Sequence, residues 1–348
     1  MSRLKVAICG NEIEDDDFLW VKACEDFSDQ VDYERINLTK ADWLERIEQV
    51  NADWYLLKPG GFTSHFKQLY DERVLVMEGL GLKMFPNRNE VFIYENKRYL
   101  SFWLKANGIP HPATDVLYYK EEALNFVKNS SFPIVGKTNI GASGAGIQIL
   151  KSLEQAEKYV VDVFSGKGAQ KRVGPNMKKG GLIKRGLNLL FNPKLLRKRL
   201  SIYKSLSGEA QTQFLIFQEF IPHDFEWRVV RIGNNFFAHK KLKLGEKASG
   251  SLEKNYDDPP LDLLTFAKEI TDRFGLYSQA VDVFESERGY LVNEMQCIFG
   301  QSDAYQMKVG GKVGRYTWQD DSWLFEEGDF NQNASFNLRV SHVLNQGK

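Results

Sequence analysis

The amino-acid sequence predicts a mixed α/β fold, with α+β character in its second half. Two observations lead to this fold class. Strand-like and helical segments alternate over residues 4–86, which is typical of a small parallel sheet with crossover helices. Further along, strand-like runs at 214–220, 226–232 and 235–242 follow one another with no helix between them, as in an antiparallel meander.

The N-terminal unit, residues 1–86, contains the alternating pattern. Its predicted strands are 4–9, 31–36, 53–57 and an edge strand at 83–86. Its predicted helices are 18–27, 41–50 and 65–79. Together they give the small parallel sheet.

The second unit, residues 87–222, begins with a helix predicted over 89–107, because Gly108 and Pro110 supply the usual stop signal. The other elements expected in it are strands 114–118, 133–137 and 147–150 and helices 121–129 and 153–164. A basic insertion, residues 165–208, interrupts this unit.

The third unit, residues 223–348, contains the rest of the meander. A helix is predicted over 261–274, followed by strands 278–284 and 289–295. Residues 299–348 show no regular pattern and are expected to be irregular.

The composition is that of a globular enzyme. Of 348 residues, 43% are hydrophobic and 26% are charged, which excludes a wholly disordered chain. No apolar run approaches the roughly 20 residues that span a bilayer, and the N-terminus lacks the apolar core of a signal peptide. Three cysteines at no metal-ligand spacing indicate reduced thiols. We therefore expect a cytoplasmic protein.

Charge is unevenly distributed, although the formal net charge is zero. Residues 163–208 hold many Lys and Arg and no Asp or Glu. Asn192 before Pro193 predicts a helix start, and the following residues have the spacing of a basic amphipathic helix. The segment 167–204 fits either contact with an anionic surface or polymer, or packing on its own domain with a solvated basic face. Both interpretations stay open.

A glycine-rich loop follows the strand that ends at Lys137 and closes at Gly146, before another strand-like run. Glycines and a serine let backbone N–H groups approach a phosphate, and the lysine adds a compact positive charge. A Walker A loop is excluded because no helix follows, and the G-x-G-x-x-G dinucleotide pattern is absent. Two interpretations remain: a flap over phosphates, or a glycine-rich hairpin with a solvated lysine.

Basic and acidic residues elsewhere extend the phosphate hypothesis. Lys97 can reach the same nucleotide, unless it is a solvated helix residue. Glu219 ends an apolar strand that can offer hydrogen bonds to an adenine edge. Arg228 alternates with the apolar Trp227, so it points off the other face of its strand, where its planar charge suits phosphate or carboxylate. The alternative for Arg228 is a surface ion pair with Glu226.

Two carboxylates lie within apolar strands, Asp282 in 278–284 and Glu294 in 289–295. Such carboxylates are costly unless they are paired or bound to metal. Oxygen ligands on adjacent strands suit Mg²⁺ bridged to ATP phosphates, and Gln296 falls on the same face as Glu294. A salt bridge to a core arginine is the alternative for each carboxylate.

In this order the motifs resemble the ATP-grasp superfamily, and most of all its glutathione-synthetase and ribosomal-protein glutamate-ligase branch. The resemblance covers about residues 85–300 and rests on an ordered set of short motifs. These are Glu95-Asn96-Lys97, Gly108-Ile109-Pro110, Lys137 with its glycine loop, Gln218-Glu219-Phe220-Ile221, Glu226-Trp227-Arg228, Asp282 and Glu294-Met295-Gln296. One position departs from the family, which usually carries Asn where Gln296 stands, and this leaves a second metal site open.

The resemblance implies an ATP-grasp architecture, in which a small N-terminal parallel-sheet domain is followed by two subdomains that clasp ATP. It also implies a role for each matching residue. These are Lys97 and Lys137 at the phosphates, Ser143 and Gly144 in the closing loop, Glu219 and Ile221 at the adenine, and Asp224 or Glu226 near the ribose. Asp282, Glu294 and Gln296 would hold one or two Mg²⁺ ions, with Mn²⁺ as a substitute.

The chemistry implied is ligation. ATP-grasp ligases transfer the γ-phosphoryl group to a carboxylate, and an amine or thiol then attacks the acylphosphate, which releases ADP and phosphate. Such catalysis consists mainly of positioning and charge neutralisation. Arg228 would steady the transferring group, and Lys241 or its neighbours Lys240 and Lys243 would hold the acceptor carboxylate.

Two other functions remain open. An ATP-grasp phosphotransferase would phosphorylate a hydroxyl, and a nucleotide-binding module would have lost catalysis through the change at Gln296. Neither the carboxylate nor the amine is identified by the sequence, although sugar acids and amino acids are the first candidates. A homodimer is compatible with the sequence.

Overall fold

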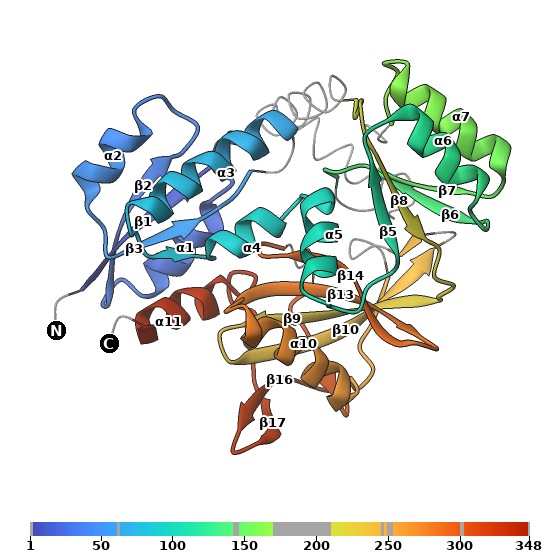
Figure 1. Cartoon of the computed structure of the whole chain (residues 1–348). Coiled ribbons are helices and arrows are strands. Elements are labelled where there is room, and N and C mark those ends of the chain that lie inside the picture. The colour runs from blue at the N-terminus through green and yellow to red at the C-terminus, as the bar shows by residue number, and fades with distance from the viewer. Residues whose placement is uncertain are drawn as a thin grey trace, which may run out of the picture.

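Three β-sheets and the helices packed on them make up the described part of the computed structural model (Figure 1). The described residues are 3–60, 63–141, 146–169, 210–244, 247–248, 253–299 and 303–346. The predicted mixed α/β class is confirmed, since one sheet is parallel and two are antiparallel. No helix within these ranges is long and apolar enough to cross a membrane.

The first sheet is the predicted parallel sheet, with strand order β2-β1-β3-β4. Its strands are β1 (Leu4–Gly10), β2 (Val31–Asn37), β3 (Trp54–Leu57) and β4 (Met84–Phe85). Its helices are α1 (Phe18–Asp26), α2 (Trp43–Val50) and α3 (Ser64–Gly79). The central strand β1 is almost continuously apolar because helices cover both of its faces, α1 on one side and α2 with α3 on the other.

Helix α11 (Phe336–Gln346) returns to this first sheet and packs beside α1 (Figure 1). The ring centroid of Phe336 lies 4.9 Å from that of Trp20, and Val340 joins the same buried cluster. The prediction that residues 299–348 are irregular is therefore wrong in this segment. Phe336 and Val340 of α11 therefore complete the buried cluster around Trp20.

A hairpin also departs from that prediction. Strands β16 (Lys312–Gln319) and β17 (Ser322–Glu327) follow the short β15 (Lys308–Val309) at one edge of the third sheet. Asp320 and Asp321 make the turn with φ of 46° and 56°. Positive φ at both turn residues usually favours Asn or Gly, so two aspartates are a weak sequence signal.

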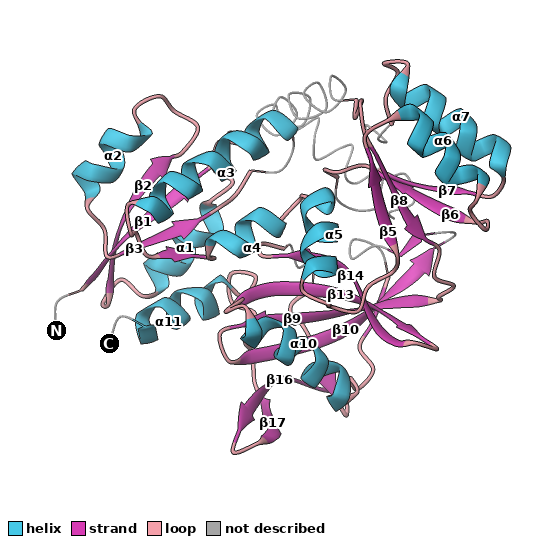
Figure 2. Ribbon diagram, viewed as in Figure 1, coloured by secondary structure: helices cyan, strands magenta, loops and turns pink. Residues whose placement is uncertain are grey.

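The second sheet has strand order β5-β8-β6-β7, and its helices lie on one face (Figure 2). The strands are β5 (Thr114–Leu117), β6 (Ile134–Lys137), β7 (Ile147–Leu150) and β8 (Leu215–Glu219). The helices are α6 (Lys120–Lys128) and α7 (Leu153–Phe164). The predicted meander is wrong in one member, because β8 pairs with β5 and β6 rather than with the next strand, β9. Consecutive apolar runs reveal strands but not their partners.

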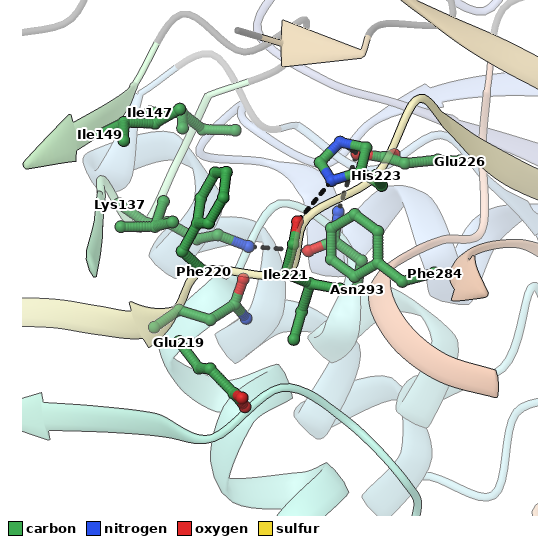
Figure 3. Close-up of a pocket in the computed structure, with 12 residues that line it drawn as sticks. Lys137, Ile147, Ile149, Glu219, Phe220, Ile221, His223, Glu226, Phe284 and Asn293 are labelled. Carbon is green, nitrogen blue, oxygen red and sulfur yellow. Dashed lines mark hydrogen bonds and ion pairs between the residues drawn. The ribbon is translucent and has the colours of Figure 1, made fainter. Parts of the chain in front are cut away.

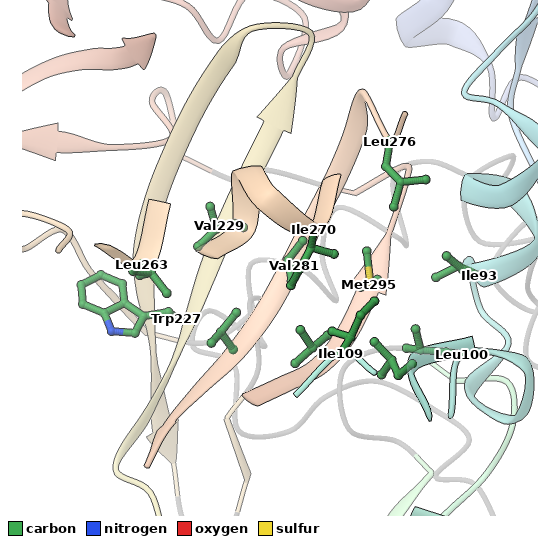
Figure 4. Packing of buried hydrophobic residues seen from close by; sticks show 14 of the residues in the cluster. Ile93, Leu100, Ile109, Trp227, Val229, Leu263, Ile270, Leu276, Val281 and Met295 are labelled. Carbon is green, nitrogen blue, oxygen red and sulfur yellow. The ribbon is translucent and has the colours of Figure 1, made fainter. Parts of the chain in front are cut away.

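The third sheet is the largest, with nine strands and the order β14-β13-β9-β10-β16-β15 along its main path. Besides the hairpin it contains β9 (Phe225–Ile232), β10 (Asn235–Leu244), β11 (Lys247–Ala248), β12 (Lys254–Asn255), β13 (Ser278–Ser286) and β14 (Gly289–Gln296). Helices α4 (Arg88–Ile93), α5 (Lys97–Ala106) and α10 (Leu261–Arg273) complete this region. Apolar side chains from the sheet and these helices meet in the largest buried cluster (Figure 4).

The helix predicted over 89–107 is instead two helices, α4 and α5, and the break between them determines where Lys97 lies. Glu95 lies between them with φ of 50°, a conformation that interrupts a helix. The Asn96 side chain then accepts a hydrogen bond from the Tyr99 backbone N–H and caps α5. Lys97 therefore becomes the first residue of a helix.

Candidate active site

Charged side chains gather on the face of the third sheet opposite its large apolar cluster. Along β9, Trp227 and Val229 point into that cluster, so Glu226 and Arg228 point the other way. The neighbouring strands add further charges to this face, namely Lys241 of β10, Asp282 of β13 and Glu294 of β14. Register places these residues side by side: Arg228 and Glu294 both lie opposite Asp282, and Lys241 lies opposite Glu226.

Asp282 stands at the centre of an ion-pair network. Arg228 donates to it twice, from Nε to Oδ1 at 2.8 Å and from Nη2 to Oδ2 at 2.9 Å. Lys241 Nζ bridges Asp282 Oδ2 and Glu226 Oε2, at 2.6 Å from each. Asp282 thus has the arginine partner that the sequence left as an alternative, and Arg228 takes Asp282 rather than Glu226.

These contacts keep Asp282 and Lys241 charged. Burial opposes ionisation of Asp282, but Arg228 and Lys241 outweigh it and hold the pKa of the carboxyl well below its usual range. Burial also opposes the charge on Lys241, yet Asp282 and Glu226 raise the pKa of that lysine above its ordinary value. The network is a fixed array of charge rather than a proton-transfer site.

Lys97 links the sheet to the glycine loop. Its Nζ lies 3.0 Å from Glu294 Oε1 and donates to the Gly141 carbonyl at 2.9 Å. The Gly141 N–H in turn donates to Glu95 Oε2 at 3.0 Å. The start of the glycine loop is therefore fastened to the first turn of α5.

Strand β14 contains a β-bulge that the sequence did not reveal. Asp282 pairs with Glu294 but Val283 pairs with Val292, so Asn293 is an extra residue on its strand. Strict alternation would turn Asn293 toward the apolar core. Its Oδ1 instead accepts a hydrogen bond from Lys137 Nζ at 2.9 Å, and its Nδ2 donates to Glu226 Oε1 at 3.3 Å. Asn293 is the site residue that sequence reasoning missed.

A pocket lies between the second and third sheets, with about 450 Å³ of empty space that includes its open mouth (Figure 3). Most of its walls are apolar, and Lys137, Glu226 and Asn293 contribute the polar atoms near one another. The lining residues are Val135, Lys137, Ile147, Ile149, Gln218, Glu219, Phe220, Ile221, His223, Glu226, Phe284 and Asn293. A flat apolar group carrying an anionic tail fits such a slot.

The structure brings most of the predicted residues together, but not all. Glu219 lines the pocket, while its carboxylate pairs with Arg288 at 2.7 Å. Asp224 is exposed and is not among the lining residues. Gln296 lies opposite Ala280 on β13, half-buried. Ser143 and Gly144 lie outside the described residues, as does the basic insertion after residue 169.

Of the three lysines considered for the acceptor, Lys241 alone joins the ion-pair network. Lys240 lies over the Phe225 ring and pairs with Asp257. Lys243 donates to the His223 backbone carbonyl. Alternation along β10 separates Lys240 from Lys241, which explains why adjacent lysines have different surroundings.

The donor set fits a magnesium ion that arrives with phosphates. Asp282 and Glu294 are cross-strand partners, and both are ionised carboxylates with depressed pKa values. Mg²⁺ in nucleotide sites usually takes one or two carboxylates together with phosphate oxygens and waters. Within the described residues no group of three or more His, Cys, Asp or Glu could hold a metal by itself. The residues therefore offer part of a coordination shell, not a closed cage.

Comparison with known sequences gives a short match. No family model matches the chain. It is 26% identical over 129 residues to the carbamoyl phosphate synthase large chain of Pyrococcus furiosus. That stretch is 36% of this chain but 12% of the relative, so most of the larger protein has no counterpart in the match.

Comparison with solved structures covers nearly the whole chain. The RimK-domain ATP-grasp protein of Sphaerobacter thermophilus has a TM-score of 0.51 and 15% identity, over 86% of this chain and 93% of that one. D-alanine–D-alanine ligase of Bacillus anthracis has a TM-score of 0.53 and 12% identity, over 99% and 100%. The biotin carboxylase domain of the Hydrogenobacter thermophilus 2-oxoglutarate carboxylase, in complex with MgADP, has a TM-score of 0.54 and 13% identity, over 87% and 66%. At such identities the likeness concerns the fold, and the fold of this chain is ATP-grasp.

Proposed function

We propose that this protein is an ATP- and magnesium-dependent ligase that joins a carboxylate to an amine or thiol. The reaction would pass through an acylphosphate and release ADP and phosphate. The observation that carries the proposal is the pocket between the second and third sheets, whose apolar walls end at Lys137 beside an array of buried charges. The fold is shared with D-alanine–D-alanine ligase and with a carboxylase domain solved with MgADP, which supports the same class.

The nucleotide would lie with its adenine in the apolar part of the pocket. Ile147 and Ile149 of β7 form one wall, and Ile221 and Phe284 form another (Figure 3). We assign Glu219 to the adenine through its backbone, because its carboxylate already pairs with Arg288. Glu226 remains the candidate for the ribose, since it lines the pocket and Asp224 does not.

The phosphates would lie at the inner end of the pocket. Lys137 lines that end, and Lys97, Arg228 and Lys241 carry positive charge in the adjoining network, paired with the carboxylates of Glu226, Asp282 and Glu294. Four cationic side chains in one array suit a triphosphate. Asp282 and Glu294, with the amide oxygen of Gln296, would hold magnesium, which when bound neutralises charge on the phosphate oxygens. Arg228 would then steady the transferring group, and Lys241 would hold the acceptor carboxylate.

The proposal is tested by trapping the acylphosphate. The protein would be incubated with ATP, Mg²⁺, hydroxylamine and individual sugar acids, amino acids and short peptides. We expect at least one carboxylate to give hydroxamate and ADP in equal amounts, because hydroxylamine captures activated carboxylates without a specific amine site. ADP release that never yields hydroxamate, or ATP binding with no release for any carboxylate, would count against a ligase.

Nucleotide affinity should fall as the pH rises above 8. Burial lowers the pKa of Lys137 to about 8, and its direct partner Asn293 is neutral. A bound phosphate favours the charged lysine, so binding takes up a proton once the free lysine begins to lose its own. Calorimetric titration with ATP should show the dissociation constant rising by up to about tenfold per pH unit above this pKa. Lys137→Arg, which stays charged, should flatten the profile; a flat profile in the wild type contradicts the prediction.

A further inference from the structure

The bulge in β14 brings two consecutive side chains to the same space. Val292 and Met295 both lie in the apolar cluster, so the two residues between them, Asn293 and Glu294, both face the charged side. In a regular strand only one of two neighbours would do so. The extra residue therefore adds an amide side chain to the charged face, next to the predicted magnesium-binding carboxylate of Glu294.

The Asn293 amide joins the second sheet to the third. Its oxygen accepts from Lys137, the last residue of β6, and its nitrogen donates to Glu226 on β9. Glu226 is in turn held by Lys241 at 2.6 Å. A continuous chain of hydrogen bonds thus runs from the pocket lysine to the ion-pair network around Asp282.

The chemistry of this contact distinguishes Lys137 from the other site lysines. Lys97 and Lys241 each have a carboxylate within 3.0 Å, whereas Lys137 donates to an amide oxygen. An amide orients an ammonium group through one hydrogen bond and leaves the positive charge and the other protons for a second acceptor. A carboxylate at that place would hold the lysine equally well and would neutralise it.

We propose that Asn293 is a positioning residue, which fixes the Lys137 ammonium at the inner end of the pocket while preserving its charge for nucleotide phosphates. This inference rests on the proposed nucleotide site. It assigns to Asn293 a role that no motif of the sequence indicated, since the amide that the superfamily pattern places in this strand falls at the position of Gln296.

The test compares ligands that differ only in phosphate number. Dissociation constants for adenosine, ADP and ATP would be measured by calorimetry for the wild type, Asn293→Asp and Asn293→Ala. EDTA would be present, so that a new carboxylate cannot recruit magnesium. Asn125→Asp on α6, an exposed residue remote from the pocket, makes the same change of charge and serves as the control.

The expected result is a loss of affinity that grows with the number of phosphates in the ligand. Asn293→Asp should weaken ATP binding by about 30-fold and ADP binding by about tenfold, and should leave adenosine within about twofold of the wild type. Asn293→Ala should weaken ATP binding by only about fivefold, because it removes the orientation but adds no competing charge. Thus Asn293→Asp, although isosteric, should weaken ATP binding more than Asn293→Ala does.

Two results overturn the inference, and they are distinguishable. If Asn293 merely supports the fold, the isosteric Asp variant will be milder than Ala and all three ligands will lose affinity alike. If the wild type binds neither ATP nor ADP, the proposed function fails together with this role. Adenosine affinity and the thermal unfolding midpoint of each variant show whether the pocket and the fold remain intact.

Discussion

Asp282→Asn should lower the free energy of unfolding by about 3–5 kcal/mol, as expected when one partner of a buried ion pair is removed. The Asp282 side chain is 1% exposed, and its partners Arg228 and Lys241 are 12% and 4% exposed. Asparagine keeps the shape of the side chain, but it removes the negative charge that compensates the buried Arg228 and Lys241. Urea unfolding at neutral pH, followed by tryptophan fluorescence, measures the loss.

Two further variants separate charge from shape. Asp282→Asn combined with Lys241→Met should recover part of the loss, because one of the unpaired cations is removed along with the carboxylate. Asp320→Asn, at an exposed turn of the β16–β17 hairpin, should leave stability nearly unchanged. A value for Asp282→Asn within about 1 kcal/mol of the wild type would show that the network contributes little.

Acid should weaken the same network. The folded-state pKa of Asp282 is depressed, so its contribution is fully present above the ordinary pKa of about 3.8 and is lost as the pH falls below it. The Asp282→Asn variant should therefore lose less stability than the wild type between neutral pH and this acidic range. Urea midpoints at several pH values provide the comparison.

Glu294→Gln should abolish most turnover while leaving the fold intact. Glu294 is 23% exposed at its side chain, and its pair with Lys97 is partly screened, so the change in stability should stay below about 1 kcal/mol. Loss of the negative charge removes a proposed magnesium ligand, and we expect ADP formation to fall by about 1,000-fold, or roughly 4 kcal/mol of transition-state stabilisation. The readout is ADP release with the carboxylate found by hydroxamate trapping.

Glu327→Gln is the matched control for this variant. Glu327 also pairs with a lysine across two strands, with 2.9 Å between Lys312 Nζ and its Oε2, but it lies on the outer hairpin. Its turnover should equal that of the wild type. Turnover of Glu294→Gln within a few-fold of the wild type would remove Glu294 from the proposed metal site.

The sequence was sufficient to predict the strands of the first two sheets and four strands of the third, and it singled out most of the residues that the structure brings together, for identifiable physical reasons. Strand β1 and helix α7 have strong, uninterrupted patterns, and the structure places them within a residue of the predicted bounds. Asp282 stood out because a carboxylate in an apolar strand needs a partner. Sequence patterns do not reveal which distant segments pair. The separation of β8 from β9 and the approach of Arg228 to Asp282 therefore appear only in the structure.

Local irregularities account for the other differences. The residue Glu95, with positive φ, divides a helix that the stop signals at Gly108 and Pro110 had suggested to be continuous. The bulge at Asn293 changes which way a side chain faces, and no periodicity in the sequence marks it. Helix α11 was missed for a different reason. Its apolar residues Phe336 and Val340 have helical spacing, but they pack on the far N-terminal sheet rather than on neighbouring segments.

The packing of α11 on α1 has a consequence for how the protein is made. Phe336, which covers Trp20 edge-on, is added to the growing chain more than three hundred residues after it. Until then the apolar cluster around Trp20, beside α1, stays partly open to water and to other nascent chains. Ribosome-bound chains that stop before α11 should therefore need a chaperone to stay soluble, and packing around the first sheet should finish only after α11 has left the exit tunnel.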